Sequence, residues 1–152
     1  MHSNRKLEMT EELFSLGYID DGMELPGRIE ASQLTNSNRR FWDTLEFTYR
    51  VAVPTEGKIL DAKVAKFERD AFQSPELIVK AHEAKSAFIA SHVKTWNLKN
   101  RGGHDVPLNA KSVMNLHEVL FDRLLDIVRG NSMSDPAPGE PEPMTHEEQA
   151  LN

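Results

Sequence analysis

Histidines and carboxylates are the residues of this sequence best suited to chemistry, either as metal ligands or as acids and bases. The six histidines are dispersed along the chain at His2, His82, His92, His104, His117 and His146. His82 and His92 are ten residues apart, so on one helix they would lie about 15 Å apart and could not share a metal. His117–Glu118 is not followed by the second histidine of a zinc-protease motif. Each histidine is therefore expected to be structural or solvated.

Other patterns associated with catalysis are absent or incomplete. Asp20–Asp21 and the pair Asp122/Asp126 are expected in a solvated loop and on an exposed helix face. Gly102–Gly103 has neither the GxGxxG spacing nor the lysine of a phosphate-binding loop. The sequence has no GxSxG motif, and the absence of cysteine removes thiolate ligands and thiol nucleophiles. We therefore expect a protein that is not an enzyme and that binds no metal or cofactor.

Length and charge narrow the class further. A chain of 152 residues is the size of one domain with tails. No apolar run approaches the ~20 residues that span a membrane, and the N-terminus lacks a signal-peptide core, so a cytoplasmic protein is the default. Residues 131–152 hold five of the 24 acidic residues and no lysine or arginine. The rest of the chain, with 19 acidic and 18 basic residues, is almost neutral, which argues against a nucleic-acid partner.

One group of residues could bind nucleic acid even though the body of the chain is almost neutral. Arg39, Arg40 and Lys58, with Trp42 and Tyr49 nearby, could form a stacking surface for single strands. We prefer an ordinary sheet face flanked by charges, because no RNP-like motif is present.

A long helix over Ser74–Leu98 is expected to organise the fold. Ser74 can cap it, Pro75 suits its first position, and Glu76 meets the positive end of the helix dipole. No glycine or proline interrupts the next twenty residues. One face carries residues at three- and four-residue steps: Ile78, Ala81, Ala84, Phe88, Ile89, His92, Val93 and Trp96. Trp96 is the largest anchor on that face.

Strands are expected before this helix. The segment Arg40–Val53 alternates apolar and polar residues and is rich in β-branched and aromatic side chains, which is typical of a half-buried strand. A short strand around Arg28–Leu34 and the turn-rich residues 35–38 indicate an antiparallel pair. Because an isolated hairpin is marginal in water, the pair must pack on the helices or on another subunit.

Further helices complete the body. Lys58–Ala71 has apolar residues at helical spacing. Asn109 can cap a helix over Ala110–Met114, and Asn115 can divide it from another over Leu116–Val128. The predicted fold is therefore α+β, with an antiparallel β-hairpin or small sheet packed on a three- to four-helix bundle.

The chain divides into a flexible N-terminal arm (1–22), a body (23–130) and a tail (131–152). Gly130 follows the last helix at the position of a helix stop. In the tail, four of the eight prolines of the chain lie within eight residues, without any apolar period. This composition predicts disorder, and we expect the tail to be dispensable for folding.

Three features of the segment Leu45–Val128 point to a family. They are an aromatic strand that ends in Tyr49–Arg50, a tryptophan in KTWNL (94–98), and VPLNAKSVMNL (106–116) after a glycine turn. Together they resemble the tail assembly chaperones of tailed bacteriophages and prophages. The resemblance covers about half of the chain and rests on its pattern rather than on an invariant motif.

The resemblance implies a non-catalytic protein that binds tape-measure or tail-tube components in the cytoplasm of the bacterial host. Trp42, Tyr49 and Trp96 are the expected partner-binding residues, since aromatic residues dominate interface hot spots. For Trp96 a core position is the preferred alternative. A second class stays open, a structural virion protein, in the tail or at the head–tail junction, that assembles through an exposed β edge. The sequence defines neither the partner nor the oligomeric state.

Overall fold

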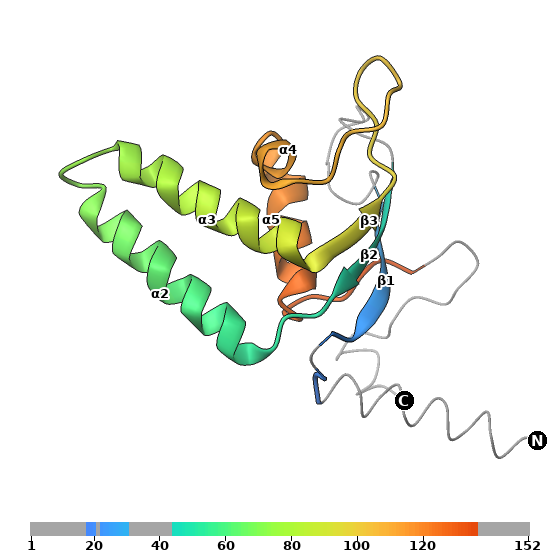
Figure 1. Cartoon of the computed structure of the whole chain (residues 1–152), viewed down its shortest axis with the longest axis horizontal. Helices are drawn as coiled ribbons and strands as arrows, with labels where there is room; N and C mark the ends of the chain where they lie inside the picture. Colours follow the sequence, from blue (N-terminus) through green and yellow to red (C-terminus); the bar gives the residue numbers. More distant parts are fainter. Residues whose placement is uncertain (1–17, 21, 31–43, 137–152) are drawn as a thin grey trace, which may run out of the picture.

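The computed structural model describes residues 18–20, 22–30 and 44–136. Within these residues the elements follow the order β1-β2-α2-α3-β3-α4-α5, with one three-stranded antiparallel sheet of order β1-β2-β3 (Figure 1). The α+β class and the small antiparallel sheet are confirmed, as is the approximate number of helices.

The sheet has β2 (Leu45–Arg50) at its centre, between β1 (Glu24–Ile29) and β3 (Val93–Trp96). Alternate residues of β2 are buried, as its sequence predicts, because one face of the sheet packs on the helices. The main core contains fully buried side chains from β1, β2, α3 and α5: Ile29, Leu45, Ile89, Leu120, Leu124 and Ile127.

Strand β1 lies earlier in the sequence than predicted. The expected strand was Arg28–Leu34, but β1 includes Pro26 and Gly27. Proline is tolerated on the outer side of an edge strand, where no neighbouring strand needs its N–H. Gly27 lies opposite Phe47, and a Cβ at this position would be 2.3 Å from two carbons of the Phe47 ring. Pro26 and Gly27 normally interrupt a strand. Here proline suits the edge position, and glycine leaves room for the Phe47 ring.

We expect Gly27→Ala to lower the free energy of unfolding by about 1.5 kcal/mol, because the Phe47 ring must move to admit the methyl group. Urea denaturation followed by circular dichroism measures this change. Pro26→Ala, at the exposed neighbouring position, is the control and should change stability by less than about 0.5 kcal/mol. Equal stability of Gly27→Ala and the wild type would contradict the close approach of the ring.

Helices α2 (Pro54–Asp70) and α3 (Glu76–His92) form an antiparallel hairpin that projects from the rest of the body (Figure 1). Helix α2 begins four residues before the predicted start, because Pro54 suits the first position of a helix. A second, smaller core cluster of Leu60, Val64 and Ala81 holds the two helices together.

The predicted helix Ser74–Leu98 is too long at both ends. Ser74 does not cap α3, since its hydroxyl donates to the Glu76 carboxylate (3.2 Å) and Pro75 occupies the capping position. At the other end α3 stops at His92, and Val93–Trp96 forms β3 on the free side of β2. These four residues include β-branched and aromatic side chains, so pairing with β2 outweighs the continuing helical period.

The C-terminal helices were predicted more accurately. Asn109 Oδ1 accepts a hydrogen bond from the Ser112 N–H (2.9 Å) and caps α4 (Ala110–Met114). Asn115 ends α4, and α5 (Glu118–Val128) follows as a separate helix. Gly130 has a φ of 76°, the left-handed conformation that glycine adopts after a helix end.

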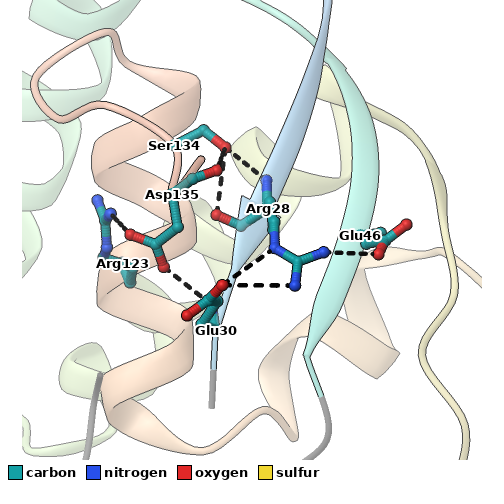
Figure 2. Close-up of polar contacts among 6 residues, drawn as sticks. All are labelled: Arg28, Glu30, Glu46, Arg123, Ser134 and Asp135. Carbon is teal, nitrogen blue, oxygen red and sulfur yellow. Dashed lines mark hydrogen bonds and ion pairs between the residues drawn. The ribbon is translucent and has the colours of Figure 1, made fainter. Parts of the chain in front are cut away.

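Beyond Gly130 the chain turns back along β1 (Figure 2). The Asp135 N–H donates to the Arg28 carbonyl (2.8 Å), and Arg123 of α5 donates to the Asp135 carboxylate (3.0 Å). The chain therefore contacts the body as far as Asp135, five residues beyond the boundary predicted after Gly130. Several predicted segments lie outside the described residues: most of the arm (1–17), the end of the first strand (31–34), the turn (35–38), the start of the second strand (40–43) and the remainder of the tail (137–152).

Candidate functional site

The structure describes two of the three predicted partner-binding residues, and Trp42 lies outside the described residues. Tyr49 is 6% exposed and lies 5.5 Å from the Phe47 ring, measured between centroids; burial raises the pKa of its phenol. Trp96 is half-buried against the main core, and its indole N–H donates to the Val106 carbonyl (2.8 Å). Both side chains therefore help to pack the body, and their contact with a partner stays a prediction.

Three charged or polar side chains meet where β2, α2 and α3 come together. Arg50 donates to both carboxylate oxygens of Glu56 (3.0 and 3.1 Å). Glu56 also accepts from the Val53 N–H (3.2 Å) at the start of α2. His92 is 1% exposed, and its Nε2 lies 3.1 Å from Glu56 Oε2 and 3.0 Å from Arg50 Nη2. The hydrogen bonds from Arg50 hold the pKa of Glu56 at about 2, below its ordinary value of 4.5.

The hydrogen bonds of His92 determine what its ring can do. Nδ1 lies 2.7 Å from the Phe88 carbonyl, which only accepts, so Nδ1 carries a proton. A neutral ring accepts at Nε2 from Arg50, whereas a protonated ring donates from Nε2 to Glu56. Both ring nitrogens therefore have a hydrogen-bond partner whether the ring is neutral or protonated. The cluster also links β2, α2 and α3. This is the chemistry of a structural network, and no motif or spacing in the sequence connects these three residues.

The other histidine of α3 is also used in packing. His82 lies with its Nε2 3.1 Å from the Met114 carbonyl and its ring 4.5 Å from that of Phe121. Within the described part of the chain, no three histidine, cysteine, aspartate or glutamate side chains are grouped so as to hold a metal ion.

Three exposed large apolar side chains lie at the far end of the α2–α3 hairpin. Phe72, in the turn, is 96% exposed, and Ile78 and Val79, in the first turns of α3, are 60% and 52% exposed. We call these three residues the hairpin tip. Ile78 belongs to the apolar face predicted for the long helix, but α3 extends there beyond the elements that bury its later residues.

Two ion pairs lie close to the hairpin tip along the chain. Arg69 forms an ion pair with Asp70 (3.6 Å) at the end of α2, and Lys80 forms one with Glu83 (3.5 Å) in α3. An apolar centre with a charged, solvent-exposed rim is the usual composition of a protein-binding patch. The sequence signal for it is Phe72, an aromatic residue in the turn that follows the charged end of α2.

Comparison with models of known protein families, with curated proteins and with solved structures finds no match to this chain. Among the described residues, none of the helices has the length and apolar character needed to cross a lipid bilayer.

Proposed function

We propose that this protein is a non-catalytic assembly chaperone of a tailed bacteriophage or prophage. In this proposal it binds a tape-measure or tail-tube component through the hairpin tip, in the cytoplasm of the bacterial host. The family part of the proposal depends on the sequence resemblance. The binding part depends on one observation, the exposure of Phe72, Ile78 and Val79 at the end of a projecting helical hairpin.

The exposure of Phe72 suits a side chain that packs on another molecule. Burying a phenylalanine side chain is worth about 1.5–3 kcal/mol, yet Phe72 is 96% exposed. A cluster of exposed apolar residues with a polar rim is typical of a protein-interaction surface. A chaperone that shields an apolar partner segment before assembly requires such a surface and requires no active site.

Phe72→Ser and Ile78→Ser, singly and together, are expected to weaken binding of the tape-measure protein of the same phage. Losing one apolar anchor should raise the dissociation constant at least about tenfold, while the melting temperature stays within error because neither side chain is buried. Pull-down after co-expression and titration calorimetry measure binding. Ile59→Ser is the matched control, since Ile59 is 70% exposed but lies near the base of α2. Unchanged binding by the double variant would refute the proposed surface.

Purified virions separate this proposal from a structural role. A chaperone that acts only during assembly should be missing from the particle, whereas a structural virion protein should be present in many copies. Quantitative mass spectrometry of washed virions makes the distinction, and abundant protein in the particle would favour the structural role.

A further inference from the structure

The outer edge of β1 is the site of this inference. Strand β1 is at one end of the sheet order, so the backbone groups on its outer side have no neighbouring strand among the described elements. Arg28 directs both its N–H and its carbonyl outward, because both groups bond to residues after α5. Successive outward positions in a strand are two residues apart, so Pro26 and Glu30 also face this edge.

We call residues 132–135 the edge segment, and its residues Ser134 and Asp135 bond to these outward groups (Figure 2). The Ser134 hydroxyl accepts from the Arg28 N–H, and the Asp135 N–H donates to the Arg28 carbonyl (2.8 Å). The Asp135 carboxylate accepts from the Glu30 N–H (2.8 Å). These three hydrogen bonds replace those that an added strand would make. At the next outward position, Pro26 has no N–H to offer.

Helix α5 holds the edge segment in place through a single side chain. Arg123 donates to the Asp135 carboxylate (3.0 Å), to the Met133 carbonyl (2.7 Å) and to the Ser132 hydroxyl. The Asp135 side chain is only 10% exposed in this arrangement. One arginine therefore fixes the segment that closes the edge.

The charges on the edge suit a second copy of the same strand. Arg28 and Glu30 are consecutive outward-facing residues, and they already lie within 3.4 Å of each other as an ion pair. In an antiparallel pair of β1 strands related by a two-fold axis at Ile29, each Arg28 would face Glu30 of the other copy. Opposite charges that face each other across strands stabilise such a pair, and the twofold symmetry repeats the contact.

We propose that the outer edge of β1 is a self-association site that the edge segment keeps closed. Release of the segment from Arg123 frees the backbone groups of Arg28 and Glu30, which then pair with β1 of a second copy. Self-association through this edge is independent of binding at the hairpin tip, which lies on other elements.

Asp135→Pro in the full chain is the direct test, since it removes both the N–H and the carboxylate that hold the edge. We expect its dimer dissociation constant, from sedimentation velocity over a concentration series, to be at least tenfold lower than that of the wild type. Asp135→Asn keeps the N–H but offers one acceptor oxygen to two donors, Arg123 and the Glu30 N–H, so it should strengthen association less than Asp135→Pro does. Arg123→Gln releases the segment without changing its backbone and should also strengthen association. This variant keeps the test valid if Asp135→Pro does not fold.

Charge reversal then tests the pairing of the strands. In the Asp135→Pro chain, Glu30→Lys alone and Arg28→Glu alone should each weaken the homodimer, because like charges then face each other. A mixture of the two variants should recover the dimer, because opposite charges face each other again. If Asp135→Pro and Arg123→Gln both stay folded and associate no more than the wild type, the closed edge is refuted. Association that the charge reversals leave unchanged would refute the pairing through β1.

Discussion

Replacing Trp96 by alanine is expected to lower the free energy of unfolding by about 3 kcal/mol, the lower end of the cost of truncating a core tryptophan. The side chain is half-buried against the main core, and its strand position places it opposite Phe47. The substitution also leaves the Val106 carbonyl without its indole donor. Urea denaturation followed by far-ultraviolet circular dichroism is the measurement, because the substitution itself changes tryptophan fluorescence.

Two further variants identify the cause of this loss. Trp96→Phe keeps most of the packing but removes the indole N–H, so it should cost about 1 kcal/mol. Lys94→Ala, at an exposed position of the same strand, should be nearly neutral. If Trp96→Ala were nearly as stable as the wild type but no longer bound the tape-measure protein, Trp96 would be a partner-binding anchor rather than a packing residue.

The same residue shows where local sequence patterns stop predicting this fold. Val93 and Trp96 continue the three- and four-residue spacing of α3, so the pattern alone extends the helix to Leu98. Val93–Trp96 forms a strand because it pairs with the free edge of β2, which lies more than forty residues earlier in the sequence. Propensity is a weak prior when a non-local partner supplies hydrogen bonds. By contrast, the Asn109 cap and the break at Asn115 depend on neighbouring residues, and both were predicted correctly.

The possible functional features were harder to predict than the helices. The exposure of the hairpin tip depends on how far the rest of the body extends along α3. The spacing of apolar residues in the sequence does not carry this information. The edge segment lies in a stretch whose prolines and acidic residues predict disorder, but Asp135 meets Arg123 and the backbone of β1 only in the folded chain. Composition describes the average character of a segment, whereas the position of Asp135 depends on hydrogen bonds to residues far away in the sequence.

Replacing Glu56 by glutamine is expected to cost about 2 kcal/mol at pH 7. A pKa of about 2 instead of 4.5 corresponds to roughly 3 kcal/mol, and solvent screening lowers this contribution because the Glu56 side chain is 31% exposed. Glutamine keeps one acceptor oxygen but cannot balance the charge of Arg50 or accept from it through two oxygens. His92 also loses its carboxylate partner in the interior. The free energy of unfolding from urea denaturation gives the difference.

The pH dependence of the stability difference between the wild type and Glu56→Gln tests whether the difference is electrostatic. The pKa of Glu56 is lower in the folded protein than in the unfolded chain, so its contribution is complete above about pH 4.5 and is lost as the pH falls towards 2. The stability gap between the wild type and Glu56→Gln should therefore stay constant from pH 7 to pH 5 and narrow between pH 4.5 and pH 2. Glu68→Gln, an exposed position on the same helix, should show no such gap.

A gap that stayed constant down to pH 2.5 would mean that glutamine destabilises the protein through its shape rather than its lack of charge. In that case the ion pair with Arg50 would contribute little, and the hydrogen bond to the Val53 N–H at the start of α2 would be the important contact. A gap that closes on acidification instead assigns the stabilisation to the carboxylate charge. That charge is what links the end of β2 to α2 and to His92 at the point where α3 becomes β3.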